Sequence, residues 1–536
     1  MQQGVIPNTI LQQIVEDRAI FEVFLFVLNR RLTVMDDLEF KKSFLKMDQI
    51  MLIADLLNRG VAFKLFSQQD EGLLAYFENT KVLENLKKCI QRLYERDKRL
   101  KLFPPNFWIV DKRTAERIDN LNMDSVIKSI NQSLLVNAPQ TIPFEVRAYF
   151  FRQVIQAERE QRQHMSMFGM MGQEGMEIRR EFLLEDAFAK LYGKGGDGMK
   201  DRLRIQFVDT NYIIEEGVDG GGLTKEFITK VTEQIFDPHF AFFTETTDHK
   251  IYPNHLSAHS HPNYLSLFDF FGMVVGKAIY EGILLKPQFA RFFLNKFTGT
   301  GRNQMDELQS LDPDIYGNLM KLKYFEGDVG EWGLTFAVSE DYLGKTMQIP
   351  FVPNGESEPV TSENRLQYIM HYADYMLNKK TKSQTSAFIQ GLHSVISQQQ
   401  LSYFFPDEIQ LLITGSMGED LDIGDLRRHA IYHGYKDRDP YIGEFWRIIE
   451  EDLSKEEREL FLSFVTGCTR PPLLGFKYLS PQFCVHQVVL DAGQQRLPTA
   501  STCMNMLKLP HYGGDFGKLR ESIKIAINSG AGFNLE

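Results

Sequence analysis

Four cysteines are the residues of this chain best suited to covalent chemistry, and one differs from the others in its surroundings. Cys89, Cys468, Cys484 and Cys503 form no Cys-x-x-Cys pair and have no histidine at zinc-finger spacing, so a structural metal site is not indicated. Cys503 ends the polar segment 496–503 and precedes a short apolar run. A thiol there could reach solvent while a sheet holds its backbone. From the pattern alone, a buried structural cysteine remains the simpler interpretation of all four.

The chemistry open to Cys503 depends on the bond that the thiol attacks. An unactivated thiol is already a few per cent thiolate at neutral pH. Exchange with a thioester needs no strong base, because the leaving thiolate is as good as the attacking one. Amide cleavage needs a histidine to protonate the leaving amine. His486 and His511 could each approach Cys503, although no papain-like signature surrounds the cysteine.

The glycine-rich segments do not indicate a phosphate-binding loop. Gly272-Met-Val-Val-Gly276-Lys277 lacks the required gap between glycines and the Ser or Thr after the lysine. It lies in an apolar helical pattern, where small residues let another helix approach closely. Residues 193–200 fail the same spacing, and 219–227 match no nucleotide fingerprint. The sequence therefore implies no nucleotide cofactor, and no other cofactor is indicated.

The residues around Cys503 predict a small α/β unit of about 100 residues. β-branched and apolar residues predict a strand over 483–490, and a second strand over 504–509 is stopped by Pro510. An apolar stripe at helical spacing predicts a final helix over 517–528. The loop between the two strands would carry Cys503.

The remainder of the chain is predicted to be mostly helical. Apolar spacing predicts helices that include 10–28, 73–102, 144–163 and 263–280. The Met- and Gly-rich segment 164–175 is expected to be a loop, and the polar stretches 137–143 and 420–439 are candidate boundaries. Residues 1–142 show no fixed repeat and are expected to form an irregular helical array.

The amino-acid composition limits the classes of protein to which the chain could belong. The 536 residues suggest three or four domains, and 43% hydrophobic with 24% charged residues is ordinary for a globular chain. A net charge of −11 argues against a nucleic-acid partner. Neither a signal-peptide pattern nor an apolar stretch of roughly 20 residues is visible, so no membrane partner is expected. The few cysteines fit a reducing compartment, which predicts a cytoplasmic and/or nuclear protein.

A set of ordered motifs resembles one enzyme family. The segment Leu497-Pro-Thr-Ala-Ser-Thr-Cys-Met-Asn-Met-Leu-Lys-Leu-Pro510 is similar to the active-site segment of HECT-type ubiquitin ligases, and its cysteine lies 33 residues (536 minus 503) from the end. Five further segments match in order, namely Gly217–Phe227, Phe271–Tyr280, Pro359–Arg365, Arg470–Phe476 and the ending Gly-Phe533-Asn-Leu-Glu536. Pro143-Phe-Glu and the Pro-Thr-Ala-Ser-Thr-Cys variant most resemble the proteasome-associated subgroup.

The resemblance implies a bilobal fold, mostly α with α+β. A large helical N-lobe would cover 143–430 and a small α/β C-lobe 436–536, after the helical region 1–142. Residues 431–435 would be the hinge, with Gly434 providing backbone freedom. A hinge makes physical sense, because one cysteine must visit two sites in succession.

The implied activity is transfer of ubiquitin. Cys503 would accept ubiquitin as a thioester from a conjugating enzyme and pass it to a lysine of a protein substrate or of ubiquitin. Implied partners are therefore ubiquitin, a conjugating enzyme and protein substrates, with the proteasome added by the subgroup. Two other classes stay open, namely a cysteine-dependent thiol hydrolase and a noncatalytic helical scaffold.

The resemblance also assigns roles to further residues. Leu497, Pro498, Thr499 and Thr502 would shape the cysteine loop, although local packing is an alternative for Thr502; Phe533 would assist lysine transfer or anchor the tail. The conjugating-enzyme groove would include Leu319, Leu322, Phe325, Trp332, Leu334 and Leu392, each of which could instead be core. A second ubiquitin would bind near Phe242, Phe243 and Tyr252. Ser501 stands where many relatives have a histidine, so that position supplies no base here.

Overall fold

The computed structural model describes most of the chain. The described residues are 18–42, 46–66, 80–110, 132–167, 175–209, 213–214, 222–299, 303, 305–342, 344–415, 420–468, 470–479, 481–490 and 496–528. They fall into two compact bodies, one made of residues up to 153 with 298–380 and 398–405, the other of 154–297 with 381–397 and 406 onward. In the ranges just given, no helix combines the length and the apolar character needed to cross a membrane.

The first body is built mainly from helices. Its N-terminal part comprises α2 Arg18–Val34, α3 Asp37–Lys41, α4 Met47–Phe66, α6 Thr80–Leu100, α9 Gln132–Asn137, η2 Pro139–Thr141 and the start of α10 Phe144–Met167. Its second part comprises η6 Met305–Glu307, α17 Leu308–Leu311, α18 Pro313–Tyr324, η7 Val329–Trp332, the antiparallel pair β5 Ala337–Tyr342 and β6 Lys345–Pro350, α19 Arg365–Asp374, η8 Tyr375–Lys379 and α21 Gln398–Leu401.

Local sequence explains several of these helices. In α6 the residues Leu86, Cys89, Ile90 and Leu93 recur at helical spacing, and all are buried. The helix α18 begins with a proline, and the Asp312 side chain accepts hydrogen bonds from two backbone N–H groups of its first turn. The helices predicted over 73–102 and 144–163 correspond to α6 and α10, although residues 67–79 lie outside the described ranges.

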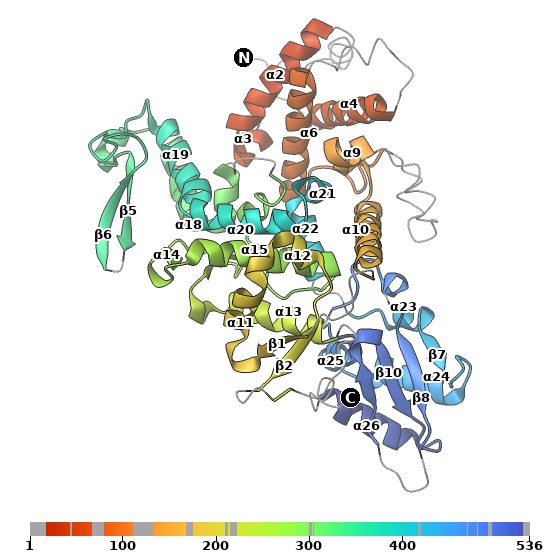
Figure 1. Cartoon of the computed structure of the whole chain (residues 1–536). Coiled ribbons are helices and arrows are strands. Elements are labelled where there is room, and N and C mark those ends of the chain that lie inside the picture. The colour runs from red at the N-terminus through yellow and green to blue at the C-terminus, as the bar shows by residue number, and fades with distance from the viewer. Residues whose placement is uncertain are drawn as a thin grey trace. The chain divides into compact units, whose positions relative to one another are not determined.

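The second body combines helices with small sheets (Figure 1). Its first part comprises β1 Met176–Arg179, η3 Arg180–Phe182, α11 Leu183–Leu191, η4 Tyr192–Lys194, α12 Gly195–Lys200, β2 Ile205–Val208, α13 Gly222–Ile235, η5 Pro238–Phe240, β3 Phe243–Glu245, β4 Ile251–Pro253, α14 Ser257–Ser260, α15 Tyr264–Glu281, α16 Arg291–Leu294, α20 Lys382–Val395 and α22 Pro406–Thr414. The fold is thus mostly α with α+β parts, as the sequence predicted.

The helices α15 and α20 approach each other through glycines. A Cβ atom added to Gly272 would lie 1.9 Å from the carbonyl oxygen of Phe388, and one added to Gly391 would lie 1.8 Å from that of Asp269. The predicted close approach at the Gly272–Gly276 motif is therefore confirmed. Lys277 of the same motif is fully buried, and its Nζ donates to Glu281 Oε1 at 2.6 Å and to a backbone carbonyl. Burial lowers its pKa.

The C-terminal part of the second body has its own sheet and core. It comprises α23 Ile423–Arg428, β7 Ile431–His433, α24 Pro440–Arg447, η9 Ile448–Asp452, α25 Lys455–Thr466, η10 Phe476–Tyr478, β8 Cys484–Val488, β9 Thr499–Ser501, η11 Thr502–Met504, β10 Met506–Pro510 and α26 Phe516–Asn528. The strand order is β7-β8-β10-β9; β7 and β10 run parallel to β8, while β9 is antiparallel to β10. The buried core includes Trp446, Phe445 and Phe483.

Most predicted elements of this part are present, with one correction. The strands predicted over 483–490 and 504–509 correspond to β8 and β10, and the final helix to α26. Ile431–His433, expected as a hinge, instead form β7 and pair with Cys484–His486. Rotation of the backbone there would break this pairing, so Ile431–His433 belong to the C-terminal sheet.

A glycine-to-alanine substitution tests the helix contact. We expect Gly272→Ala to lower the free energy of unfolding by about 3 kcal/mol, because the added methyl group meets backbone rather than a movable side chain. Gly443→Ala is the matched control, since α24 has open space at that position and alanine favours helix by about 1 kcal/mol. Denaturant unfolding followed by circular dichroism measures both, and equal stability of the two variants would contradict the proposed contact.

Candidate functional site

The cysteine loop is a tight turn held between two paired strands. β9 and β10 pair through Ser501↔Met506, Ala500↔Leu507 and Thr499↔Lys508, and the backbone of Cys503 lies in η11 between them. The sequence predicted a loop and one strand here but missed β9. A three-residue strand has too little sequence pattern to detect, and it exists because β10 supplies its hydrogen-bond partners.

Asn505 fixes the end of this turn. It is fully buried and adopts the left-handed conformation (φ 49°), in which Asn is tolerated far better than most residues. Its Nδ2 donates to the carbonyl oxygen of Pro481 at 2.6 Å, and its own carbonyl oxygen accepts from the Cys484 N–H at 3.0 Å. Two hydrogen bonds of one residue therefore bind the Cys503 turn to the start of β8. Sequence reasoning did not single out Asn505.

The side chains preceding the cysteine pack inward. Thr502 and Ser501 are each 8% exposed. A Cβ atom added at Gly467, which follows α25, would lie 3.7 Å from Thr502 Cβ and 3.9 Å from Lys225 Cδ, and Lys225 Nζ donates to the carbonyl oxygen of Thr466 at 3.3 Å. Thr502 thus packs against the end of α25, close to a lysine from α13.

The other loop residues lie along the entry to β9. Leu497 is 40% exposed, Pro498 is buried and Thr499 is half-buried in β9. The Tyr512 hydroxyl donates to the carbonyl oxygen of Arg496 at 2.6 Å, which ties the start of this segment to the far end of β10. Phe533 and residues 217–221 of the glycine motif lie outside the described residues.

The two histidines are placed differently relative to the turn. His511 follows Pro510 at the opposite end of β10, roughly 16 Å along the strand from Met506. Its ring stacks on Tyr441, with 4.4 Å between centroids. His486 pairs with Lys508, two positions along β10 from Met506, and is exposed. His511 is therefore too distant to protonate a leaving group at the turn.

Two of the other cysteines have environments that disfavour reactivity. Cys89 is fully buried, its Sγ donates to the carbonyl oxygen of Leu25, and burial raises its pKa to about 12. Burial also raises the pKa of Cys484, which is 2% exposed. Cys468 is half-buried after α25. Across the described ranges, no group of three or more His, Cys, Asp or Glu residues could hold a metal ion.

The expected groove residues divide into buried and accessible sets. Leu319, Leu322 and Leu392 are 6%, 1% and 0% exposed. Trp332 is 41% exposed and contacts Phe325, with ring centroids 5.1 Å apart. Leu334 is half-buried. Only the accessible residues offer surface to another protein without rearrangement of the core.

Three further apolar side chains lie exposed in the first body, which also holds every residue of the expected groove except Leu392. Tyr324 ends α18, while Leu366 and Met370 lie one turn apart on α19, which packs against α18. Arg365 Nη1 donates to the carbonyl oxygen of Phe325 and links the start of α19 to this region. Sequence reasoning missed Leu366 and Met370. Their i, i+4 spacing on a helix was the available signal.

The second-ubiquitin surface needs correction at two positions. Phe242 and Phe243 are 2% and 6% exposed and pack against Phe268 and Phe271. Side chains so deeply buried have no area to offer a bound protein, so they belong to the core. Tyr252, in β4, is half-buried.

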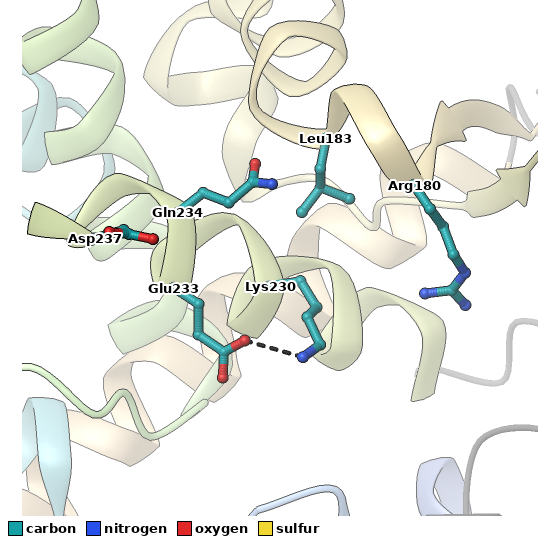
Figure 2. A pocket seen from close by; sticks show the side chains of 6 residues that line it. All are labelled: Arg180, Leu183, Lys230, Glu233, Gln234 and Asp237. Carbon is teal, nitrogen blue, oxygen red and sulfur yellow. Dashed lines mark hydrogen bonds and ion pairs between the residues drawn. The ribbon is translucent and has the colours of Figure 1, made fainter. Parts of the chain in front are cut away.

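A cavity of about 330 Å³ lies beside η3, α11 and α13 (Figure 2). It is lined by Arg180, Leu183, Lys230, Glu233, Gln234 and Asp237. Its charges are largely paired: Lys230 and Lys286 both bond to Glu233, and Arg180 bonds to Glu226. Its lining holds no cysteine and none of the predicted site residues.

Known proteins resemble the chain along most of its length. Residues 229–536 match the HECT-domain (ubiquitin-transferase) model. The chain is 33% identical to mouse "Ubiquitin-protein ligase E3B" over 94% of its residues and 49% of that protein. It is 37% identical to Arabidopsis "E3 ubiquitin-protein ligase UPL6" and 35% identical to yeast "E3 ubiquitin-protein ligase HUL5", over 75% of its residues and 39% and 45% of theirs. It spans about half the length of such relatives or less. The chain belongs to the HECT-domain (ubiquitin-transferase) family.

Proposed function

We propose that this chain is a ubiquitin ligase that carries ubiquitin as a thioester on Cys503. The observation that supports the proposal most strongly is the Cys503 turn, held by β9, β10 and the buried Asn505 within a part of the chain that matches the ubiquitin-transferase family. A turn fixed in this way holds the backbone of Cys503 at a defined position on the sheet.

The proposed reaction has two exchanges. The Cys503 thiolate attacks the carbonyl carbon of the thioester between ubiquitin and the conjugating enzyme, and the conjugating enzyme's thiolate leaves. A lysine amine then attacks the new thioester, Cys503 leaves as thiolate, and the nitrogen loses a proton as the isopeptide bond forms. Neither leaving group is an amine, so no histidine acid is required. This agrees with Ser501 at the position where relatives carry histidine and with the distance of His511.

The partners follow from this reaction. The conjugating enzyme would bind the exposed Trp332 and the half-buried Phe325 and Leu334, with the exposed Tyr324, Leu366 and Met370 beside them; this set is called the groove surface below. Aromatic anchors of this kind are frequent hot spots in protein interfaces. Ubiquitin and protein substrates complete the set of partners, and Tyr252 remains a candidate contact for a second ubiquitin. The subgroup motifs support the proteasome as a further partner, in the cytoplasm and/or nucleus.

The domain boundaries remain proposals, and the proposed start of the C-terminal lobe is moved. The C-terminal lobe would begin near Leu421, the first residue of the C-terminal core, rather than at 436. The pivot between lobes would then lie before Leu421, because Ile431–His433 are paired in the sheet. Residues 143–153 together with 298–380 and 398–405 share a body with the N-terminal region. Such a pivot would let Cys503 reach both the conjugating enzyme and the substrate lysine.

Substitution of the nucleophile tests the proposed function. In a reaction with activating enzyme, a conjugating enzyme, ATP and ubiquitin, we expect Cys503→Ala to abolish a ubiquitin adduct that reducing agent removes. Cys468→Ala, which changes a half-buried cysteine in the same body, should keep the adduct. Non-reducing electrophoresis measures it. An adduct that survives Cys503→Ala would refute the assignment, and release of free ubiquitin without transfer would favour the hydrolase.

Asn505 offers a test of how the turn is held. We expect Asn505→Ala to lower single-turnover loading of Cys503 about tenfold, since it removes the bond to Pro481 and places alanine in a left-handed conformation. Asn505→Gly keeps the backbone conformation and should lose less. Quench-flow electrophoresis measures the rates at a temperature where circular dichroism shows folded protein. Wild-type loading by both variants would show that the turn does not depend on this amide.

Trp332 tests the groove surface. We expect Trp332→Ala to raise the KM for charged conjugating enzyme about tenfold with little change in maximal rate, because an exposed aromatic side chain contributes to binding more than to folding. Met347→Ala is the control, an exposed apolar residue on β6 in the same body. Initial loading rates across conjugating-enzyme concentrations separate KM from maximal rate. An unchanged KM would place the binding surface elsewhere.

A further inference from the structure

A buried carboxylate links the N-terminal helices to the end of α18. Asp36, between α2 and α3, is 3% exposed. Its Oδ2 accepts from Lys323 Nζ at 2.6 Å and from the Tyr324 hydroxyl at 2.8 Å. Its Oδ1 accepts from the Glu39 N–H at 2.7 Å, and Glu39 also pairs with Lys323 at 3.0 Å. Both carboxylate oxygens of Asp36 therefore accept hydrogen bonds, and two of the donors, Lys323 and Tyr324, are nearly 290 residues away from Asp36 in the sequence.

A second ionic link runs beside the first. Arg99 of α6 bonds to both oxygens of Asp37, and it lies 3.5 Å from Asp306 and 3.5 Å from Glu307 of η6. Arg96, 1% exposed, also pairs with Asp37. The helices α2, α3 and α6, called the N-terminal clamp below, thus hold the start and the end of the segment 305–324.

The ionisation of Asp36 and Tyr324 fits this arrangement. Burial acts to raise the pKa of Asp36, but hydrogen bonds from Lys323, the Glu39 backbone and Tyr324 outweigh it, and the pKa is lowered. Burial and the bond to Asp36 raise the pKa of Tyr324. At neutral pH the site therefore holds an ionised carboxylate between an ammonium group and a neutral phenol.

The bonded residues lie directly beside the groove surface. Lys323 and Tyr324 are the last two residues of α18, and Phe325 follows them. Tyr324 is 48% exposed although its hydroxyl bonds to a buried group. On the other side, Arg365 bonds to the Phe325 carbonyl oxygen, and the Phe325 ring contacts Trp332. The side chains of the two residues before Phe325 are therefore held by Asp36, and the Phe325 carbonyl oxygen by Arg365.

We propose that the N-terminal clamp positions the groove surface for the conjugating enzyme, with Asp36 as the positioning residue. The proposal rests on the function proposed above and gives the region 18–100 a role in the same reaction. A buried ion pair stabilises less than apolar packing of similar volume would, but it demands one geometry. Here that geometry sets the end of α18 and the position of Phe325, whose ring contacts Trp332 of η7.

The test substitutes the carboxylate in the full chain. We expect Asp36→Asn to raise the KM for charged conjugating enzyme about tenfold and to leave the maximal rate of Cys503 loading nearly unchanged. Tyr324→Phe removes one hydroxyl and should raise KM by a smaller factor. Asp48→Asn, at an exposed acid of α4, is the matched control and should leave both constants unchanged.

The outcomes separate positioning from simple stabilisation. A structural role alone would reduce the fraction of protein that loads while KM stays at the wild-type value, and this result would overturn the proposal. If Asp36→Asn does not fold by circular dichroism, Tyr324→Phe decides, and an unchanged KM overturns the proposal. The Trp332→Ala variant, measured in parallel, distinguishes failure of the clamp proposal from failure of the groove-surface proposal. A raised KM there with a wild-type KM in Asp36→Asn and Tyr324→Phe refutes the clamp alone, whereas an unaffected Trp332→Ala refutes the groove surface itself.

Discussion

The hydrogen bond from Asn505 Nδ2 to the Pro481 carbonyl oxygen joins the cysteine turn to the strand beside it. A turn of three residues between antiparallel strands has few contacts of its own, and its exit requires a left-handed residue. Asparagine meets that backbone requirement, and its amide reaches the Pro481 carbonyl oxygen just before the start of β8. The position of the Cys503 backbone therefore depends on the side chain of a different residue, Asn505.

A different constraint shapes the helical part of the second body. Along α15 and α20 the two backbones come close enough that a methyl group cannot enter at Gly272 or Gly391. Contact between backbones leaves little room for sliding, since no flexible side chain lies between them. Phenylalanines then fill the surrounding space, with Phe388 in contact with Phe243, Phe289 and Phe293. This explains why an aromatic-rich sequence yields a tightly packed interior.

The first body uses charge where the second uses close packing. Asp36, Asp37, Arg96 and Arg99 join segments that are remote in the sequence; Asp36 and Arg96 are buried, and Asp37 and Arg99 are half-buried. Ionic contacts of this kind specify geometry, because an unpaired charge left in the interior is costly. The groove surface lies where this network ends, so its shape is coupled to helices that contribute none of its exposed side chains.

The amino-acid sequence by itself determined the family and the elements with long regular patterns, and its motifs are the basis for proposing Cys503 as the nucleophile. Helices such as α10, α15 and α26 were predictable because apolar spacing over three or more turns is a local signal. The three-residue strands β7 and β9 were not, because only their partners make them strands. The burial of individual side chains could not be predicted from the sequence either. Phe242 could be a surface aromatic or a core residue, and only its contacts with Phe268 and Phe271 show that it is core. Only the tertiary structure brought Asn505 to Pro481 and Asp36 to Lys323 and Tyr324, since hydrogen bonds between residues far apart in sequence leave no periodic trace in it.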